Sequence, residues 1–419
     1  MISALEQYDP QIYELLRQEA ARQSGSIRLI ASENYVSKAV MIASGSCMTN
    51  KYAEGYPNKR YYEGQQVTDL IETIAQERAK KLFKADHANV QPYSGSIANM
   101  AAYLALIEPG DTIMGLSLPH GGHLTHGWKV SLTGKIFNSV QYTVDPKTGM
   151  FDYDQIADLA KKHKPKLIIS GATAYPRAID FKAFSEIAKS VGAYMVSDIA
   201  HIAGLVAAGI HQSPVPYADV VSTTTHKTLR GPRGGMLLCK AEHAANVDKA
   251  VFPGLQGGPH MHSISAIAVA MAEANTPEFV QYAKQIVKNS KAMAEKLLEC
   301  GFELVSGGTD NHLILIDLRN KNIPGKKLAK ALDRARIVSN CNSIPNDPAP
   351  PFNPSGLRIG TAAVTTRGMK EAQAQQIAEF INQVAENVDN DAAIEKISKE
   401  VLLLCSQFPV PEHFIITGK

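Results

Sequence analysis

The chain contains 419 residues, a length that predicts two or three domains with a large core and excludes a peptide hormone or a lone binding module. Its 43 Lys and Arg against 40 Asp and Glu give a net charge of +3, so nothing in the charge indicates a surface for nucleic acid or an anionic membrane. With 30 Gly, 22 Pro and 45% hydrophobic residues, the composition is that of a globular protein, not of a disordered or collagen-like one.

The apolar segments and the cysteines bear on the compartment. No apolar stretch reaches the roughly 20 residues that a membrane span needs, and the N-terminus lacks the basic start and apolar core of a signal peptide. The cysteines are scattered without C-x-x-C spacing, at Cys47, Cys239, Cys300, Cys341 and Cys405. We therefore expect a cytoplasmic protein that uses no membrane, with reduced thiols that are mostly small buried groups.

The spacing of apolar residues predicts the first elements in chain order. Asp9-Pro10 begins an amphipathic helix that ends near Ser24-Gly25, and a second helix follows over about 67–82. Short apolar runs then alternate with helices: strands at 89–91, 112–118, 166–170, 193–198 and 220–225, with helices at 97–107 and 180–191. This alternation predicts an α/β fold whose large domain has a mostly parallel mixed sheet between helices.

The pattern changes near residue 262. A long helical region over 262–300 is interrupted only around Thr276-Pro277. A strand pair at 302–305 and 312–318 and helices at 325–335 and 367–388 then predict a smaller C-terminal α+β domain. The predicted division is an N-terminal helical arm at 1–25, a large domain at 26–285 and a small domain at 286–419.

The segment from Ser222 to Gly235 carries the strongest chemical signal. It places Lys227 after a strand of β-branched residues, in a turn rich in Gly and Pro, where α/β proteins bind ligands. A lysine there can form a Schiff base with a carbonyl cofactor, because desolvation and nearby cations lower its pKa. A solvated surface charge is the alternative for a lone lysine, so its neighbours in the fold decide between the two.

Two further segments supply such neighbours. Asp198 ends the predicted strand 193–198, where it can pair with the protonated ring nitrogen of pyridoxal phosphate or cap a helix that begins at Ile199. Gly95 and Ser96 lie between a strand and a helix, where backbone N–H groups can bind a phosphate or simply cap the helix.

Three histidines, His120, His123 and His126, lie among glycines. Their spacing admits a zinc site, but the glycines oppose a rigid helix and the segment contains no acidic or thiol ligand. We therefore predict no metal here, and we expect an imidazole that stacks on an aromatic cofactor ring.

These motifs belong to a longer series that resembles serine hydroxymethyltransferase, a family of pyridoxal-phosphate enzymes with the aspartate-aminotransferase-like fold. The matching segments are, in order, 30–35, 50–57, 59–62, 120–127, 198–204, 223–235, 252–259, 306–312 and 355–358. The resemblance implies reversible conversion of L-serine and tetrahydrofolate to glycine and 5,10-methylenetetrahydrofolate. It also implies pyridoxal 5'-phosphate held covalently by Lys227, in a homodimer with shared active sites.

The resemblance assigns a role to each matching residue. Around the cofactor it implies Lys227 as the covalent anchor, with Thr224 and His226 beside it. At the ring it implies Asp198 at the nitrogen, His123 stacked on one face, and His201 and Thr173 near the phenolic oxygen. At the phosphate it implies Gly95 and Ser96, joined by Gly258 of a neighbouring subunit.

Around the substrates the resemblance implies a second set. Arg358 would bind the substrate carboxylate with help from Ser32, a bidentate task that a lysine does not perform. The acid/base and hydroxyl-contacting set, reaching in from the partner chain, would be Tyr52, Glu54, Tyr61 and Tyr62, and the folate contacts would be Leu118, Gly122, Leu124 and Asn342. Glu54 is the expected proton-handling carboxylate, with its role as acid, base or orienter left open.

Some positions depart from the family's bacterial pattern. Tyr93 stands where a histidine is common, Thr173 where serine is, and Ala362 where a proline would be expected. Cys341 replaces a lysine between two asparagines, which removes a cation near the folate tail.

Two other functions remain open from the sequence. Another enzyme of this fold, such as a threonine aldolase or an aminotransferase, would share Lys227, Asp198 and Arg358 but need not carry the segment at 52–62. A non-catalytic binding protein would need none of these side chains together.

Overall fold

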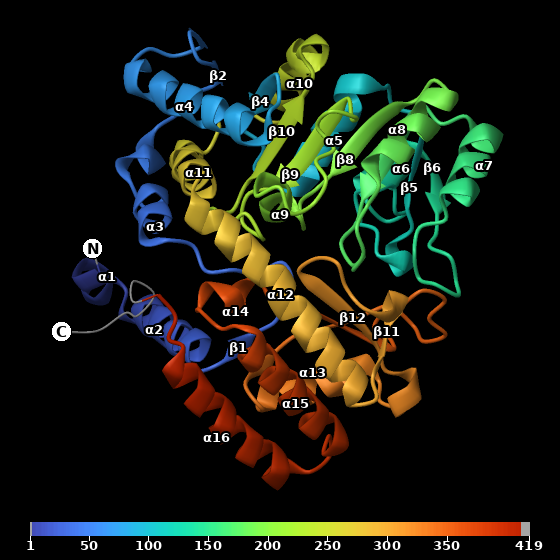
Figure 1. The fold of residues 1–419 in the computed structure, drawn as a ribbon. Coiled ribbons are helices and arrows are strands. Elements are labelled where there is room, and N and C mark those ends of the chain that lie inside the picture. Colours follow the sequence, from blue (N-terminus) through green and yellow to red (C-terminus); the bar gives the residue numbers. More distant parts are fainter. Residues whose placement is uncertain (1, 412–419) are drawn as a thin grey trace.

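A seven-stranded mixed sheet forms the centre of the larger lobe in the computed structural model, which describes residues 2–411 (Figure 1). In spatial order its strands are β4 (His87–Asn89), β10 (Gly235–Cys239), β9 (Val220–Thr224), β8 (Tyr194–Asp198), β7 (Leu167–Gly171), β5 (Thr112–Leu116) and β6 (Asn138–Tyr142). Neighbours from β9 to β6 are parallel, whereas β10 is antiparallel to both β9 and β4. The predicted α/β class with a mostly parallel mixed sheet is confirmed.

Helices cover both faces of this sheet because successive strand side chains point to opposite faces. In β7, Leu167 and Ile169 lie in the core that includes α5, whereas Ile168 lies in the core that includes α8. The covering helices are α4 (Gln66–Phe83), α5 (Gly95–Leu106), α7 (Tyr153–His163), α8 (Phe181–Ser190), α10 (Ala244–Lys249) and α11 (Met261–Ala274).

The smaller lobe has its own sheet and core. Its antiparallel sheet has the order β11 (Glu303–Leu304), β12 (Leu313–Asp317), β15 (Gly356–Gly360) and β14 (Asn340–Asn342). The helices of this lobe are α13 (Gly325–Arg334), α14 (Ala362–Thr366), α15 (Glu371–Glu386) and α16 (Asp391–Gln407). The expected α+β arrangement after the large sheet is therefore present.

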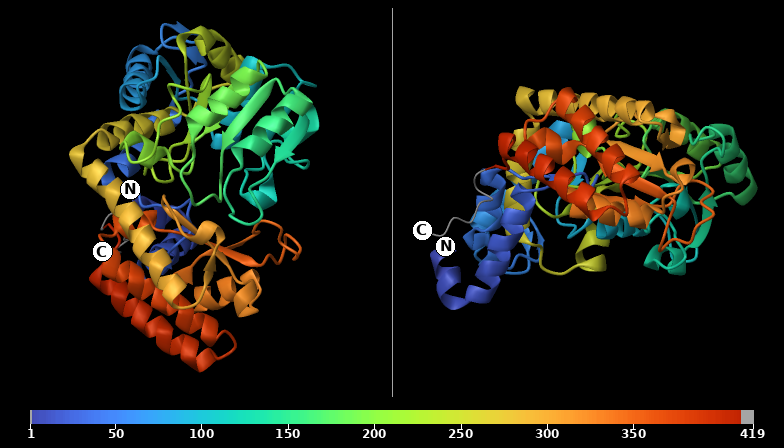
Figure 2. Two further views of the ribbon diagram at one scale, coloured as in Figure 1. Left: turned by 45° about the vertical axis from the view of Figure 1, so that its right-hand side comes forward. Right: turned by 90° about the horizontal axis from the view of Figure 1, so that it is seen from below.

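One helix, α12 (Pro277–Glu299), runs from the larger lobe into the smaller one (Figure 2). Its Phe279 and Ile286 lie in the core of the larger lobe, and its Met293 and Leu297 lie in the core of the smaller lobe. The predicted interruption before this helix is confirmed, because Thr276 caps it and Pro277 occupies its first turn.

Short elements complete the chain. The N-terminal α1 (Ile2–Tyr8) and α2 (Pro10–Ser24) precede β1 (Ile27–Arg28), which pairs with β13 (Ile337–Val338) in the smaller lobe. The remaining short helices and strands are α3 (Lys38–Ser44), β2 (Gly55–Tyr56), β3 (Lys59–Arg60), α6 (Leu132–Ile136) and α9 (Ala203–Ala207). Short helical turns are η1 (Cys47–Asn50), η2 (Leu118–His120), η3 (Ala241–His243), η4 (Ala250–Leu255), η5 (Val305–Gly307) and η6 (Arg319–Lys321). The division at residues 25 and 285 stays a prediction.

Two sequence predictions of elements are wrong, and the strands β6 and β10 and the helices α7 and α16 were not predicted. The helix predicted over 367–388 does not begin at Arg367, because Gly368 has φ +85° and separates α14 from α15, which begins at Glu371. The strand at 89–91 ends at Asn89, and the Gln91 side chain turns instead toward Gly55 and Glu72. The helix α16 was not predicted, although its buried positions recur at helical spacing: Ile394, Ile397, Val401 and Leu404.

Helix length and polarity also bear on membranes. Within residues 2–411, no helix has both the length and the apolar character required to cross a bilayer.

The second core gives a direct stability prediction. Leu297→Ala should lower the free energy of unfolding by about 2–5 kcal/mol, because Leu297 is 0% exposed and its loss leaves a cavity. The matched control is the next residue on α12, Leu298, which is 43% exposed. Leu298→Ala should change the same quantity by less than about 0.5 kcal/mol in urea unfolding. Equal losses for both variants would contradict the assignment of Leu297 to this core.

Candidate active site

A cavity of about 270 Å³ opens at the carboxyl ends of β7, β8 and β9. The carboxyl ends of neighbouring parallel strands meet at one edge of a sheet, so side chains that follow them converge there. Arg358 of β15 and Ser32 complete the wall, so both sheets contribute to it. The lining residues are Ser32, Ser94, Gly95, Ser96, Asn99, His123, Ala172, Thr173, Asp198, Ala200, His201, Thr224, His226, Lys227, Arg233 and Arg358.

Lys227 lies buried in this cavity, three residues beyond the end of β9. Its own backbone carbonyl accepts a hydrogen bond from Asn34 Nδ2 at 2.9 Å, which ties the turn to the N-terminal part of the chain. Burial lowers the pKa of the Lys227 amine to about 8, and the charges of Arg358 and Arg233 act in the same direction. A far larger share of this amine is therefore unprotonated at neutral pH than in an exposed lysine.

Asp198 ends β8 beside β9, and its carboxylate is held by three donors. Oδ2 accepts from Asn99 Nδ2 at 2.8 Å and lies 3.0 Å from His126 Nε2, while Oδ1 accepts from the backbone N–H of Ala200 at 2.9 Å. Burial alone would raise the pKa of Asp198, but these hydrogen bonds and the nearby histidines lower it overall. The carboxylate is therefore a fixed negative charge. The alternative prediction of an N-cap is wrong, because the next helix begins only at Ala203.

The hydrogen bonds around His126 define which of its ring nitrogens carries the hydrogen. His126 Nδ1 accepts from the backbone N–H of His123 at 3.2 Å, so Nε2 carries the hydrogen that Asp198 accepts. Burial lowers the pKa of His123 to about 4, and its Nδ1 lies 2.7 Å from Thr125 Oγ1. Asn99 also donates to Thr125 Oγ1 at 2.7 Å. One network therefore connects the imidazole of His123 with the carboxylate of Asp198.

His201 lines the cavity, and one of its ring nitrogens is buried without a partner among residues 2–411. Its Nδ1 lies 3.3 Å from His312 Nε2, whereas its buried Nε2 makes no hydrogen bond within the described residues 2–411. Burial lowers the pKa of both imidazoles, that of His312 to about 3, so both are neutral. A buried polar atom without a partner indicates that a polar group of a ligand fits there.

Arg358 enters the cavity from β15. Its Nε and Nη2 donate to Asn340 Oδ1 at 3.3 and 3.2 Å, and its Nη1 donates to the carbonyl of Thr173 at 3.1 Å. Burial lowers the pKa of Arg358 to about 10, which leaves it charged at neutral pH. None of its partners among these contacts is a carboxylate, so the charge is available to an anion.

The start of α5 is the part of the wall that suits a phosphate. Ser94 caps α5, whose first residues Gly95 and Ser96 line the cavity. A Cβ on Gly95 would lie 2.6 Å from Thr224 Cγ2, so a glycine is required for this close approach. Arg233 adds a positive charge, with Nη1 2.7 Å from His226 Nε2.

The predicted Tyr52–Tyr62 set does not line this cavity but forms a second cluster. Tyr62 donates to Glu54 Oε2 at 2.9 Å, and Tyr52 donates to Glu54 Oε1 at 3.4 Å. A Cβ on Gly258 would lie 2.7 Å from Tyr52 Cζ, so Gly258 belongs to the same cluster. Tyr61 is exposed on the same segment.

The predicted folate positions lie beside the cavity, not in its wall. Leu118 and Gly122 flank a turn whose Gly121 carbonyl accepts from the backbone N–H of Thr173 at 2.7 Å, and the exposed Leu124 follows His123. Asn342 lies in β14, two residues from Asn340.

The positions that depart from the family pattern have definite places. Tyr93 donates to the carbonyl of Gly258 at 2.6 Å and stacks on His260. Cys341 is half-buried between Asn340 and Asn342 in β14, and Ala362 is buried at the start of α14.

Sequence reasoning missed Asn99, Thr125, Ser222 and Arg233. Ser222 donates to Asn99 Oδ1, so Asn99 is held on both sides. Asn99 lies inside α5, where no motif marks it, whereas Arg233 lies within the segment around Lys227 and could have been found there. Among residues 2–411, no group of three or more His, Cys, Asp or Glu side chains is arranged to hold a metal ion.

Comparison with known proteins agrees with this geometry. The family model described as serine hydroxymethyltransferase matches residues 5–381. A protein of Desulfotalea psychrophila named serine hydroxymethyltransferase is 58% identical over 414 residues, covering 98% of this chain and 97% of that protein. Proteins of the same name from Sorangium cellulosum and Acidothermus cellulolyticus are each 60% identical, over 410 and 416 residues, with the same coverage. The chain therefore belongs to the serine hydroxymethyltransferase family.

Proposed function

We propose that the chain is a pyridoxal-phosphate enzyme that reversibly converts L-serine and tetrahydrofolate to glycine and 5,10-methylenetetrahydrofolate. The observation that carries this proposal is the presence of Lys227, Asp198, His123 and Arg358 in the wall of one cavity. Family membership makes the same reaction the expected one. A cytoplasmic location stays a prediction, which is supported by the absence of a disulfide among the five cysteines.

The donor set of the cavity fits pyridoxal phosphate. A partly deprotonated Lys227 amine suits its aldehyde, and the Asp198 carboxylate suits its protonated ring nitrogen. The start of α5 at Gly95 and Ser96 suits its phosphate. The buried His201 Nε2, which accepts no hydrogen bond from the described residues, suits a polar substituent of the ring.

When bound, the cofactor would supply an electron-withdrawing ring that stabilises negative charge at the α-carbon of an amino acid. Asp198 would keep the ring nitrogen protonated, because Asn99, His126 and the Ala200 N–H hold its own charge. His123 would cover one face of the ring.

Other side chains would act on the substrate. Arg358 would bind the serine carboxylate through its guanidinium, with Ser32 beside it. Glu54, hydrogen-bonded to Tyr62, would hold or move the proton of the substrate hydroxyl. Folate would lie against the Leu118 to Leu124 turn and Asn342, without the cation that Cys341 replaces.

Glycine formation tests the proposed reaction. The purified protein, loaded with pyridoxal phosphate and given L-serine, should form glycine with tetrahydrofolate and far less without it. Glycine formation that does not depend on tetrahydrofolate would favour a threonine aldolase or related enzyme. No glycine in either case would exclude the reaction.

The pKa of Lys227 gives a pH prediction. The protein freed of cofactor should take up pyridoxal phosphate covalently at a rate that rises with pH and levels off above about 8, because the neutral amine is the nucleophile. An exposed lysine, with its ordinary pKa of 10.5, would continue to react faster beyond that pH. Borohydride fixation at a series of pH values, followed by peptide mapping, measures both rate and position.

Lys227→Ala is the control for this labelling and should carry no label at the site. A label on a different lysine, or a rate that still increases well above pH 8, would contradict the assignment of Lys227.

Arg358→Lys should weaken serine binding while leaving cofactor binding nearly unchanged. A lysine cannot make paired hydrogen bonds to a carboxylate, and the loss of one charge-assisted bond costs roughly 1.5–3 kcal/mol, or about 10- to 150-fold in affinity. Calorimetric titration of the loaded protein with serine measures this. The control is Arg319→Lys, because Arg319 binds Asp317 outside the cavity. Unchanged serine affinity in Arg358→Lys would remove this arginine from the substrate site.

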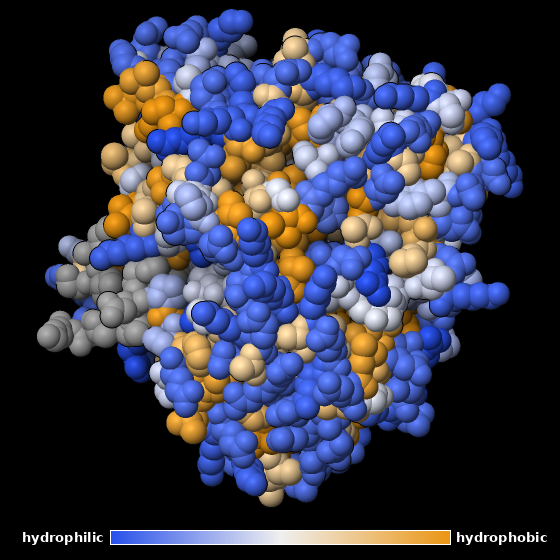
Figure 3. Space-filling view, in the orientation of Figure 1, coloured by the Kyte–Doolittle hydropathy of each residue, from blue (hydrophilic) through white to orange (hydrophobic). Residues whose placement is uncertain are grey.

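We infer that the working unit is a two-fold homodimer. Exposed apolar side chains gather over α3 and α4 at the upper left of the space-filling view (Figure 3): Met41, Ile42, Val67, Leu70 and Ile74. The cluster of Tyr52, Glu54 and Gly258 is outside the Lys227 cavity of its own chain, so a partner's cavity is where it would act. An isologous contact would complete two equivalent sites.

Mixed dimers test this sharing. Lys227→Ala and Tyr52→Ala, each inactive alone, should recover activity when they are unfolded together and refolded as a mixture. Random pairing makes half of the dimers mixed with one intact site in each, so recovery should approach about a quarter of the wild-type value. Native mass spectrometry verifies the mixed dimers. Their formation without any recovered activity would mean that each site is built from a single chain.

A further inference from the structure

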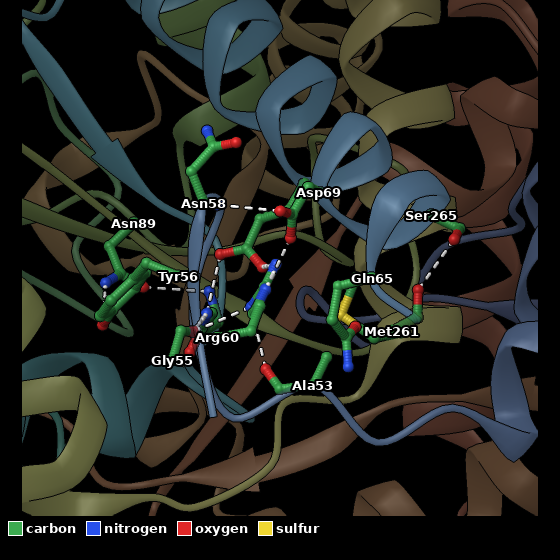
Figure 4. Close-up of polar contacts among 12 residues, drawn as sticks. Ala53, Gly55, Tyr56, Asn58, Arg60, Gln65, Asp69, Asn89, Met261 and Ser265 are labelled. Atoms are coloured by element: carbon green, nitrogen blue, oxygen red, sulfur yellow. Dashed lines mark hydrogen bonds and ion pairs between the residues drawn. The ribbon is translucent and has the colours of Figure 1, made fainter. Parts of the chain in front are cut away.

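The backbone that carries Glu54 is held at four consecutive carbonyl groups, and Figure 4 shows two of them, those of Ala53 and Gly55, with Arg60. The carbonyl of Tyr52 accepts from Gln65 Nε2 at 3.0 Å, and that of Glu54 accepts from the Tyr61 N–H at 3.1 Å. The carbonyls of Ala53 and Gly55, on either side of Glu54, both accept from Arg60 Nη1, at 2.9 and 2.8 Å. One guanidinium nitrogen therefore holds the carbonyl groups of the residues on both sides of Glu54.

Arg60 is itself held in place by two carboxylates of α4. Its Nε donates to Asp69 Oδ1 at 2.8 Å and its Nη2 donates to Glu72 Oε2 at 2.6 Å. The Arg60 side chain is 3% exposed and that of Glu72 is 0% exposed. Gln91 Nε2 donates to the other oxygen of Glu72 at 2.7 Å and to the Gly55 carbonyl at 2.9 Å. The buried ion pair of Arg60 and Glu72, with both Glu72 oxygens hydrogen-bonded, is confined to one geometry. It therefore fixes the position of the backbone around Glu54.

The hairpin of β2 and β3 brings Arg60 to this position. Gly55 pairs with Arg60 across the two strands, and Gly55 has φ +95°. A Cβ on Gly55 would lie 2.3 Å from the carbonyl oxygen of Lys59, so only glycine fits. Asp69 also accepts from the backbone N–H of Asn58 at 2.9 Å, which joins the hairpin turn to α4.

The side chains above this backbone are exposed, in contrast to its buried support. Tyr52 is 59% exposed and Tyr62 is 47% exposed, and both donate to the Glu54 carboxylate. Within one chain, Tyr52 contacts Gly258 and the Tyr62 ring, but both tyrosines remain largely in solvent. Before a partner chain packs on them, their direction therefore depends chiefly on the backbone that carries them.

We propose that Arg60 is a positioning residue for the proposed reaction: through the carbonyls of Ala53 and Gly55 it sets the direction of the Glu54 carboxylate. This inference rests on the proposed function, because it assigns Glu54 a role at the substrate hydroxyl. Arg60 touches no reacting atom and acts only through the backbone. A lysine keeps the charge but cannot reach four acceptors, because its three hydrogens radiate from one nitrogen.

A double-mutant cycle with the holoenzyme tests this role. Arg60→Lys should lower kcat for glycine formation with tetrahydrofolate by about 10- to 100-fold, because misplacement of a reacting group by about 1 Å has an effect of this size. The KM for serine should change less than about twofold, since Arg358 binds the carboxylate. In a Glu54→Gln background, Arg60→Lys should have less than about a twofold further effect, because the two residues act as one unit.

Amide hydrogen exchange supplies a second measurement that does not depend on activity. Arg60→Lys should speed exchange in peptides covering 52–61, which include the Tyr61 N–H that donates to the Glu54 carbonyl. It should leave exchange in the other peptides unchanged. The control is Arg78→Lys, because Arg78 of α4 also donates to a backbone carbonyl, that of Ala268 at 2.7 Å. It should change neither kcat nor exchange at 52–61. Asp69→Asn weakens the same support more mildly and replaces Arg60→Lys if that variant does not fold.

The outcomes separate the two proposals. An equal loss of kcat with Glu54 intact and in the Glu54→Gln background would mean that Arg60 only stabilises the fold. An unchanged kcat or unchanged exchange at 52–61 would also overturn its positioning role. If the wild-type enzyme forms no glycine from serine with tetrahydrofolate, the proposed function fails, and the exchange measurement still decides whether Arg60 orders the segment.

Discussion

The site depends on the placement of a buried amine and a carboxylate that is 10% exposed in the wall of one cavity, at one edge of the sheet. Because β8 and β9 are parallel neighbours, with Asp198 opposite Ser222 in register, the chain that leaves β9 brings Lys227 to the end of β8. Burial favours the neutral form of the amine, whereas three hydrogen bonds favour the charged form of Asp198. The cavity thereby holds a nucleophile and a fixed anion at the same pH.

The smaller lobe adds the group that such a site needs for an anionic substrate. Arg358 lies on β15 of the second sheet and lines the same cavity as Lys227, and α12 packs into the cores of both lobes. Its guanidinium rests on neutral oxygens of Asn340 and Thr173. The resulting site combines a positive charge from the smaller lobe with the start of α5 from the larger lobe. A second, exposed cluster around Glu54 is held by its own buried arginine.

Much of this could be predicted from the sequence, and the exceptions have physical causes. Lys227 and Asp198 could be predicted because Asp198 ends one strand and Lys227 follows another, and the strand ends of a parallel sheet converge. The roles of Asn99 and Ser222 could not be predicted, because their contacts depend on the register of α5 against the sheet, which no local pattern shows. Arg60 lay inside a recognised segment, but its four contacts exist only once the hairpin folds against α4. The break at Gly368 was missed because apolar spacing continues across it.

A crystal structure of the protein with pyridoxal phosphate and serine would test the central claim most directly. In the protein before serine is added, we expect continuous electron density between Lys227 Nζ and the cofactor. After serine is added, we expect the ring nitrogen within about 3.2 Å of an Asp198 oxygen and the serine carboxylate at Arg358. A cofactor bound elsewhere, or a ring nitrogen that faces a different side chain, would contradict the account.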